Sequence, residues 1–331
     1  MAKEDVERFE ELDDLFTGNL DSKMDFLDDS SNSRNNDGIY RVDLEKVKDK
    51  KKGWKSVIRF LPNITKEGKV EQSAIEKITH YVDIKNNKDL SGWFDSPKNF
   101  KEDCPLTKLY YAMKESKNAI LVEKSKMLKY SKKYYSYVLI LEDEQQPELV
   151  GKIMIFQYGK IIRDKILSEK NGDITGEECT VFDISQGKDF VLIVKETQTE
   201  QGELFPDYKM SMFRPEKTSL PIYSKEKETF KNLPLNENKK VDSKYGSYIK
   251  TFLLDREHEL EEFAPKRLTE EQQSKITEIS NFLTGKSSKN YPQKKESQAS
   301  SDDFEFDENF NEEPSKSSFE ESEDDFFSDI E

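Results

Sequence analysis

The sequence predicts a mainly β protein with helices, an α+β fold whose core is a partly closed β-barrel. Short strand-like segments follow one another with a single helical pattern between them, so the regular strand–helix alternation of a doubly wound sheet is missing. The C-terminal part of the core is helical in pattern. The residues after it are polar and then acidic, which predicts a disordered tail.

The first elements are predicted from hydrophobic spacing. A short amphipathic helix is expected over 4–16, where Val6, Phe9, Leu12 and Phe16 recur every three or four residues. A polar linker over 28–38 follows. Strands are predicted over 54–61 and 78–84. A helix is predicted over 105–116, with an apolar face formed by Leu106, Leu109, Tyr110 and Met113.

The next elements continue the β pattern. Aromatic and β-branched residues predict a strand over 134–141, and the segment 142–147 joins it as a hairpin loop to a strand over 150–158. A helix over 160–167 is followed by a strand over 190–194. This last strand is apolar throughout and is expected to be buried.

Two helices complete the predicted core, over 248–262 and 269–284. The second has clear end signals. Thr269 and Gln272 have the spacing of a capping box, and Gly285 stands just past the last helical residue.

Charge is sorted into blocks along the chain. Residues 301–331 contain 14 acidic residues and one lysine, and residues 1–38 contain 12 acidic and four basic residues. Residues 39–170, by contrast, contain 28 lysines and arginines against 19 acidic residues, although the whole chain has a net charge of −15. A basic, tyrosine-rich middle suits binding to a polyanion, and an acidic tail can compete for the same surface.

Several functional classes are poorly supported. The sequence has no apolar run of the length that a membrane span needs, and its first residues do not resemble a signal peptide. The two cysteines indicate a reducing, cytoplasmic setting. With two histidines, no glycine-rich phosphate loop and no nucleophile elbow, the chain is not expected to be an enzyme.

The segment 108–137 is the strongest candidate for nucleic-acid contact. Eight lysines stand there against two glutamates, interleaved with six tyrosines. Lysine attracts phosphates, and tyrosine offers a flat face on which a base can stack. The alternative is that many of these tyrosines pack in the core and the lysines form an ordinary solvated face. A second candidate is the pair Phe205 and Tyr208, which could stack on bases or anchor a loop to the core.

The acidic tail also contains six phenylalanines, which a purely solubilising segment would not need. A carboxylate next to an aromatic ring imitates a phosphate next to a nucleic-acid base. The tail is therefore expected to bind partner proteins and, transiently, the DNA-binding surface of the chain itself. The residues expected to contact partners are Asp324, Asp325, Phe326 and Phe327.

Short motifs in a fixed order resemble the replication single-stranded DNA-binding (helix-destabilising) protein of T-even-type phages. They lie at 57–62, 104–105, 156–160, 164–166 and 190–195, followed by the Phe205 and Tyr208 pair and the acidic tail. The resemblance implies an OB-fold core over 39–285 that binds single-stranded DNA with little sequence preference. It also implies a protein-interaction tail over 286–331, and the acidic segment over 1–38 is expected to serve self-association or partner contact.

The resemblance also suggests which residues contact DNA. Tyr134, Phe156, Phe205 and Tyr208 match the stacking aromatics of the family, and Lys129, Lys132 and Lys133 match part of its basic loop. The full set expected to contact DNA is Lys129, Tyr130, Lys132, Lys133, Tyr134, Tyr110, Phe156, Tyr158, Phe205, Tyr208 and Arg59.

Two departures from the family pattern concern zinc and the N-terminus. The family binds zinc through one His and three Cys, whereas here His80 and Cys104 match two positions and Ser96 and Thr107 replace the other two. We therefore expect no zinc and no other cofactor, with 78–118 forming a degenerate zinc-type subdomain held by packing. The family N-terminus is basic and drives cooperative binding, whereas this one is acidic, so cooperativity would need other contacts.

These observations favour sequence-independent single-stranded DNA binding in phage replication, recombination and repair, in the cytoplasm of an infected bacterium. Polymerase, helicase loader and recombinase are the partners expected for the tail, together with self-association along DNA and no membrane contact. Two alternatives stay open: an RNA-binding regulator on a similar barrel, and an acidic scaffold that binds replication proteins and no nucleic acid.

Overall fold

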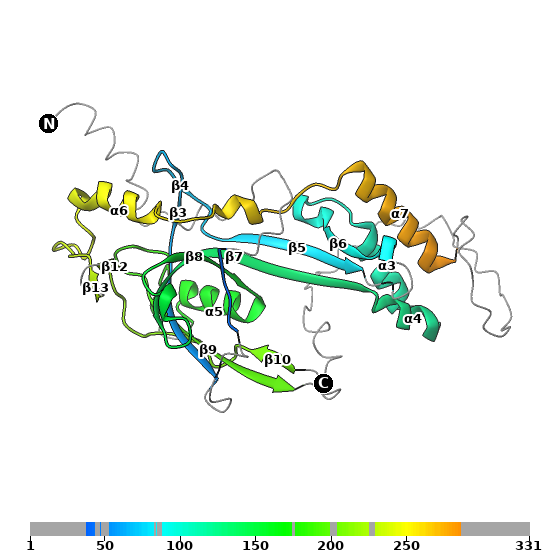
Figure 1. The fold of residues 1–331 in the computed structure, drawn as a ribbon, viewed down its shortest axis with the longest axis horizontal. Coiled ribbons are helices and arrows are strands. Elements are labelled where there is room, and N and C mark those ends of the chain that lie inside the picture. Colours follow the sequence, from blue (N-terminus) through cyan, green and yellow to red (C-terminus); the bar gives the residue numbers. More distant parts are fainter. Residues whose placement is uncertain are drawn as a thin grey trace.

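The structure is a computed structural model that describes residues 38–43, 47, 53–82, 84, 88–173, 176–198, 204–224 and 229–285. It is a mixed α+β fold with one large sheet and five helices in this part of the chain, which confirms the predicted fold class (Figure 1). The predictions for the helix over 4–16, most of the linker and the acidic tail lie outside the described residues. No helix in the described part is long and apolar enough to cross a bilayer.

The large sheet has nine strands. Six follow the order β1–β8–β7–β2–β9–β10, β11 pairs with β9, and β5 pairs with both β6 and β7. Their bounds are β1 Ile39–Tyr40, β2 Trp54–Phe60, β5 Ile75–Val82, β6 Gly92–Asp95, β7 Leu128–Asp143, β8 Ile153–Tyr158, β9 Asp189–Gln198, β10 Leu204–Asp207 and β11 Met212–Phe213. Because β1 and β10 end the path, the described strands form an open sheet and not a closed barrel.

The remaining elements surround this sheet. Two small antiparallel pairs join β3 (Asn63–Ile64) to β4 (Val70–Glu71) and β12 (Pro221–Ser224) to β13 (Thr229–Asn232). The helices are α3 Pro105–Lys114, α4 Ala119–Ser125, α5 Lys160–Asn171, α6 Gly246–Leu253 and α7 Glu270–Thr284.

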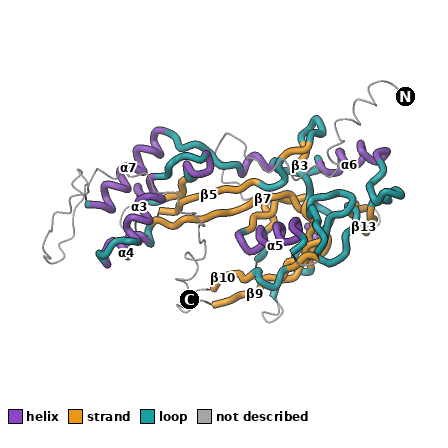
Figure 2. The backbone as a smooth tube through the Cα atoms, turned by 180° about the vertical axis from the view of Figure 1, so that it is seen from behind, coloured by secondary structure: helices purple, strands orange, loops and turns teal. Residues whose placement is uncertain are grey.

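The strand β7 connects two parts of the molecule. It is 16 residues long and pairs with three other strands. Its C-terminal half pairs with β2 and β8, and its N-terminal half pairs with β5 from Leu128 to Tyr135. Figures 1 and 2 show β5 and β7 running side by side away from the rest of the sheet toward α3, α4 and α7. The sequence predicted this strand only from Tyr134, because the lysines before it resemble a loop.

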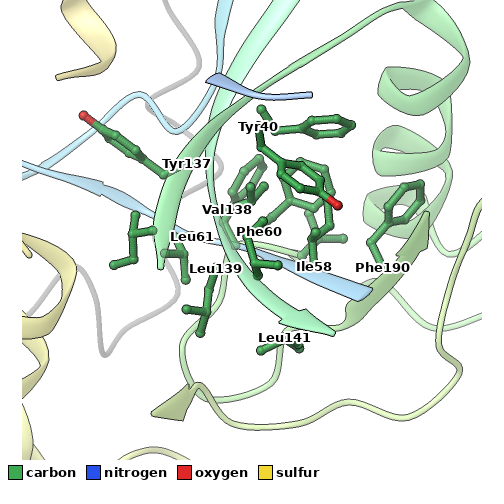
Figure 3. Close-up of a cluster of buried hydrophobic side chains, with 14 of the residues drawn as sticks. Tyr40, Ile58, Phe60, Leu61, Tyr137, Val138, Leu139, Leu141 and Phe190 are labelled. Carbon is green, nitrogen blue, oxygen red and sulfur yellow. The ribbon is translucent and has the colours of Figure 1, made fainter. Parts of the chain in front are cut away.

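The main hydrophobic core fills the space around β2, β7, β8 and β9 (Figure 3). Phe60 lies near its centre, fully buried, with its ring centroid 5.7 Å from that of Phe182 and 5.8 Å from those of Tyr158 and Phe190. These contacts are edge-to-face, a geometry worth about 0.5–1.5 kcal/mol per pair beyond the burial of area. The strand predicted over 190–194 is buried as expected, within a longer β9.

A second hydrophobic cluster lies at the far end of β5 and β7. It joins Phe94 of β6, Cys104 and Leu106 at the start of α3, and Leu128 of β7. Ile276, Ile279 and Leu283 of α7 complete it. The helix α7 thus covers β5, β6, α3, α4 and the N-terminal half of β7, which we call the subdomain. A modest apolar content is enough to stabilise this fold, because each cluster stabilises one end of the long β5–β7 ladder.

The helix predictions agree with the structure where end signals are strong. α7 begins after Thr269, whose hydroxyl accepts the Gln272 N–H while the Gln272 side chain accepts the Thr269 N–H. Gly285 follows with φ 78°, a left-handed conformation that favours glycine. α3 and α5 are also confirmed.

The continuous helix predicted over 248–262 is wrong. α6 ends at Leu253, and a separate 3₁₀ turn occupies Leu260–Phe263. Packing on Tyr137 explains the interruption: the Arg256 guanidinium lies 4.1 Å from the centre of the Tyr137 ring, and the Leu260 N–H donates to the Tyr137 hydroxyl at 2.6 Å. These tertiary contacts hold the non-helical connection 254–259 between α6 and the 3₁₀ turn.

Arg59 of β2 is a charged residue that is fully buried in the protein. Its guanidinium donates to Asp189 Oδ1 at 3.1 Å, to Thr218 Oγ1 at 2.9 Å, and to the carbonyl oxygens of Asp183 and Thr218. A Cβ at Gly187 would lie 2.4 Å from Arg59 Nη2, so glycine is needed there for close approach. The prediction that Arg59 contacts DNA therefore has no support from its position: the side chain ties β2 to β9 inside the protein.

Replacing Arg59 with Leu should lower the free energy of unfolding by about 3–5 kcal/mol, because Asp189 keeps only its longer 3.5 Å ion pair with the partly exposed Arg214 and the carbonyl oxygens of Asp183 and Thr218 lose their donor. Urea unfolding of the two proteins measures the difference. Lys108→Ala is the control, because Lys108 and Asp103 form an exposed ion pair whose loss should cost less than about 1 kcal/mol. Equal stabilities for Arg59→Leu and the unmodified chain would contradict this assignment.

Candidate nucleic-acid interface

The lysine- and tyrosine-rich segment lies mostly on β7, and the strand alternation divides it between two faces. Tyr130, Lys132 and Tyr134 share one face, which is also the face of their β5 partners His80, Ile78 and Glu76. Positions 129 and 133 belong to the opposite face. The expected basic loop is therefore a strand, and its residues cannot all meet one ligand at the same surface.

Three of the aromatic residues predicted to contact DNA stack on one another. The ring of Tyr134 lies 5.7 Å from that of Tyr158 with an interplanar angle of 22°, and Tyr158 stacks on Phe156 at 5.7 Å and 27°. All three are buried, and the Tyr158 hydroxyl shares a hydrogen bond of 3.0 Å with Ser136. Burial raises the pKa of Tyr158 above its usual value. In this structure these rings are core side chains whose faces are already occupied.

The hairpin of β9 and β10 carries the exposed predicted aromatic. Phe205 pairs with Thr197 across the hairpin, and 41% of it is exposed. Tyr208, just after β10, is half-buried against the main core, and burial raises its pKa. The two residues therefore differ in role, with Phe205 available for stacking and Tyr208 anchoring the turn.

Basic residues of α5 lie between this hairpin and β7. The Arg163 guanidinium lies 5.9 Å from the centre of the Tyr134 ring, and Lys165 Nζ donates to the carbonyl oxygen of Lys209 at 3.2 Å. Figure 1 shows α5 between β7 and the hairpin. Sequence reasoning missed Arg163 and Lys165, although Lys165 stands in the 164–166 motif of the family resemblance and Arg163 directly precedes that motif.

The hairpin region has two further exposed side chains that sequence reasoning missed. Met210 and Met212 follow Tyr208 and are 54% and 58% exposed. Met212 lies on the outer side of β11, whose other residue, Phe213, is buried. Side-chain alternation identifies Met212 as outward-facing only once β11 is known, and this short strand has no separate signal in the sequence.

Tyr110 and Tyr130 lie in the subdomain. Tyr110 packs on the second hydrophobic cluster, with its ring 5.2 Å from that of Tyr111, which is 50% exposed. The ring of Tyr130 lies 5.4 Å from the imidazole of His80. Lys132 is ion-paired with Glu76 at 3.0 Å. Tyr111 is thus the more accessible of the two neighbouring tyrosines, whereas the set expected to contact DNA included Tyr110. The tail residues Asp324, Asp325, Phe326 and Phe327 lie outside the described part.

The four positions that match the family's zinc ligands are all buried. His80 Nε2 lies 3.0 Å from Thr107 Oγ1 and 3.4 Å from Cys104 Sγ, within hydrogen-bonding distance of both. The Ser96 hydroxyl instead accepts the Lys98 N–H at the start of a 3₁₀ turn. Burial, and then the nearby charge of Lys98, lower the pKa of His80 to about 4, so its imidazole is neutral near pH 7.

This donor set does not fit a structural zinc ion. Such a site needs four strong ligands, usually thiolates and imidazoles, and neutral hydroxyl groups are poor substitutes. Here one imidazole and one thiol are present, and the hydroxyls of Thr107 and Ser96 already take part in hydrogen bonds. The described residues contain no cluster of three or more His, Cys, Asp or Glu placed for a metal. The hydrogen bonds of His80 connect β5 to α3 directly.

Purified protein should therefore contain far less than one zinc ion per chain by elemental analysis, and a chelator should leave its thermal unfolding unchanged. His80→Gln is a useful comparison, because it should destabilise the subdomain whether or not chelator is present. One bound zinc per chain, or a clear loss of stability on chelation, would show that other residues supply the missing ligands.

The family comparison agrees with the span of this fold. A family model described as "gp32 DNA binding protein like" matches residues 52–283, from the start of β2 almost to the end of α7. No curated protein matches the chain. The matched region is more than half of the sequence and contains the hairpin, α5 and the subdomain. The chain therefore belongs to the gp32-like DNA-binding protein family, which confirms its resemblance to the single-stranded DNA-binding proteins of T-even-type phages.

Proposed function

We propose that the chain binds single-stranded DNA without sequence preference and does not act as an enzyme. Family membership over residues 52–283 is the observation that carries this proposal, because the matched span includes the exposed aromatic Phe205 of the hairpin and the basic residues of α5 beside it. The mechanism combines phosphate contacts from lysine and arginine with base stacking on aromatic rings.

The proposed contacts involve groups on the surface. Arg163 and Lys165 of α5 and Lys209 after β10 would neutralise phosphates, releasing condensed counterions into solution. Phe205 would stack on a base. Any base has a flat face, so this contact does not distinguish sequences. In a duplex the faces of the bases are already stacked, so binding one strand would destabilise the duplex without ATP.

The wider role follows from the same proposal. The chain would coat single strands during phage DNA replication, recombination and repair in the cytoplasm of an infected bacterium. Its acidic tail, including Asp324, Asp325, Phe326 and Phe327, would recruit polymerase, helicase loader and recombinase and compete with DNA for the basic surface. The acidic segment over 1–38 would supply self-association through its apolar residues Phe9, Leu12 and Phe16.

Phe205→Ala should weaken binding to labelled oligo-dT about 5- to 150-fold, which corresponds to the roughly 1–3 kcal/mol that stacking on one aromatic contributes. Fluorescence anisotropy across a salt series measures this. The slope of log affinity against log salt should stay the same, because no phosphate contact is removed. The loss should be equal for mixed-sequence oligonucleotides.

Leu235→Ala is the matched control for this experiment. Leu235 is 42% exposed, close to the 41% of Phe205, and follows β13, which Figure 1 shows well apart from β10. Its substitution should leave affinity unchanged. If the unmodified chain does not bind oligo-dT at low salt, the proposal fails and the acidic-scaffold alternative becomes the better account. Tighter binding to an RNA oligomer of matched sequence would favour the RNA-binding alternative.

Ending the chain at Ser300 should strengthen binding to oligo-dT, most of all at low salt. The truncation removes 14 acidic residues that compete with DNA for lysines. Anisotropy of the full and shortened chains over the same salt series tests the effect. Unchanged DNA affinity, together with unchanged capture of a polymerase, helicase loader or recombinase, would refute both roles proposed for the tail.

A further inference from the structure

One face of the subdomain sheet was not predicted, as a whole, to be a binding site. β6, β5 and β7 form a three-stranded antiparallel sheet in which Tyr81 pairs with Trp93 and with position 129, Thr79 pairs with Asp95 and Ser131, and Lys77 pairs with Lys133. We call these residues the outer sheet face: Lys77, Thr79 and Tyr81 of β5, Trp93 and Asp95 of β6, and Ser131 and Lys133 of β7.

The other face of the same three strands is the buried one. His80, Val82 and Phe94 lie there and are 0%, 0% and 3% exposed. Val82 and Phe94 belong to the second hydrophobic cluster, which α3 and α7 cover. Because side chains alternate along each strand, the outer sheet face is directed away from that cluster. Tyr130, Lys132 and Tyr134 lie on the buried side of the ladder, so the two sets of residues are separated by the sheet.

An aromatic pair is the main apolar feature of the outer sheet face. The rings of Tyr81 and Trp93 lie 4.8 Å apart with an interplanar angle of 37°, and Trp93 is 51% exposed. Cross-strand contact with Tyr81 holds the indole in place while leaving half of it in solvent. Aromatic side chains presented on the face of an antiparallel sheet are a general means of stacking on unpaired bases.

The charges beside this pair favour an anionic partner. Lys77 is ion-paired with Asp95 at 3.0 Å, and the backbone N–H of Lys266 donates to the same carboxylate at 2.8 Å. Burial, and then the charge of Lys77, lower the pKa of Lys266, and burial lowers that of Lys133. Two ammonium groups, those of Lys77 and Lys266, thus share one carboxylate, and Lys133 has no acidic partner among the residues that the structure describes.

The register makes this arrangement unfavourable for the sheet itself. Lys77 and Lys133 stand directly opposite each other on adjacent strands, and like charges in that position destabilise a sheet. Local choices that oppose the fold tend to occur at functional sites. A phosphate between the two lysines would relieve their repulsion.

We propose that the outer sheet face is a second binding surface for single-stranded DNA, in which Trp93, supported by Tyr81, stacks on a base while Lys77, Lys133 and Lys266 neutralise phosphates. The proposal rests on the proposed function and extends it from the hairpin and α5 to the far side of the subdomain. It excludes a duplex from this face, since the indole needs an unstacked base.

Intrinsic tryptophan fluorescence can report this contact. Of the two tryptophans in the chain, Trp54 is fully buried in the main core and Trp93 is half-exposed. Trp93→Phe removes the exposed fluorophore and keeps an aromatic ring, so the difference between the emission of the unmodified protein and that of the variant isolates the signal of Trp93. Oligo-dT at saturation, judged by anisotropy of the labelled strand in the same samples, should quench that signal strongly. This measurement on the unmodified full chain does not depend on how a destabilised variant folds.

Affinity measurements complete the test. Trp93→Ala should weaken oligo-dT binding at least about 5-fold, the lower limit for one stacked base. Trp93→Phe should recover most of the loss. Tyr248→Ala is the matched control, because Tyr248 is an aromatic residue of almost equal exposure, 53%, on α6 at the opposite end of the molecule (Figure 1). It should leave affinity unchanged. Lys133→Gln should reduce the salt slope, because one phosphate contact is lost.

The outcomes separate this proposal from the proposed function. Oligo-dT binding without quenching of Trp93, with equal affinity for Trp93→Ala, would overturn the second surface and leave the function standing. No binding at low salt would overturn both. If ending the chain at Ser300 changes Trp93 emission in the absence of DNA, and oligo-dT does not, the acidic tail occupies this face and the proposal is wrong.

Discussion

The 16-residue strand β7 belongs to both parts of the molecule. Its C-terminal half pairs with β2 and β8 in the main core, and its N-terminal half pairs with β5 in the subdomain. Because one continuous strand crosses both, the backbone ladder fixes the position of the subdomain relative to the core. Its alternation also determines which tyrosines and lysines share a face. The two hydrophobic clusters stabilise this ladder from opposite ends.

Polar contacts connect the ladder to distant segments. Arg59 joins β2 to the segments around Asp183, Asp189 and Thr218. Tyr137 of β7 contacts the segment after α6, since the Arg256 guanidinium lies over its ring and the Leu260 N–H donates to its hydroxyl. In the subdomain, His80 contacts Thr107 and Cys104 where related proteins are expected to hold zinc. In each case a buried polar group has partners from segments far apart in the sequence, which makes the arrangement specific as well as stable.

Hydrophobic spacing and end signals predicted the fold class, α3, α5 and the capped helix after Thr269, because these depend on residues close in sequence. The interruption after Leu253 could not be predicted, since it depends on a tertiary contact with Tyr137. The site was less predictable still. Tyr134, Phe156 and Tyr158 have the composition of stacking residues, but burial against one another is a property of the packed sheet. Trp93 was not predicted as a site residue, because its position beside Tyr81 on one sheet face depends on the register of β5 and β6.

Competition between single- and double-stranded DNA distinguishes base stacking from purely electrostatic binding. An unlabelled oligonucleotide is titrated against a complex of the full chain with labelled oligo-dT, first as a single strand and then annealed to its complement at the same salt. Exposed aromatics such as Phe205 need unstacked bases, so the single strand should displace the label at far lower concentration than the duplex. Equal displacement by both forms would mean that binding is purely electrostatic, and base stacking would have no part in it.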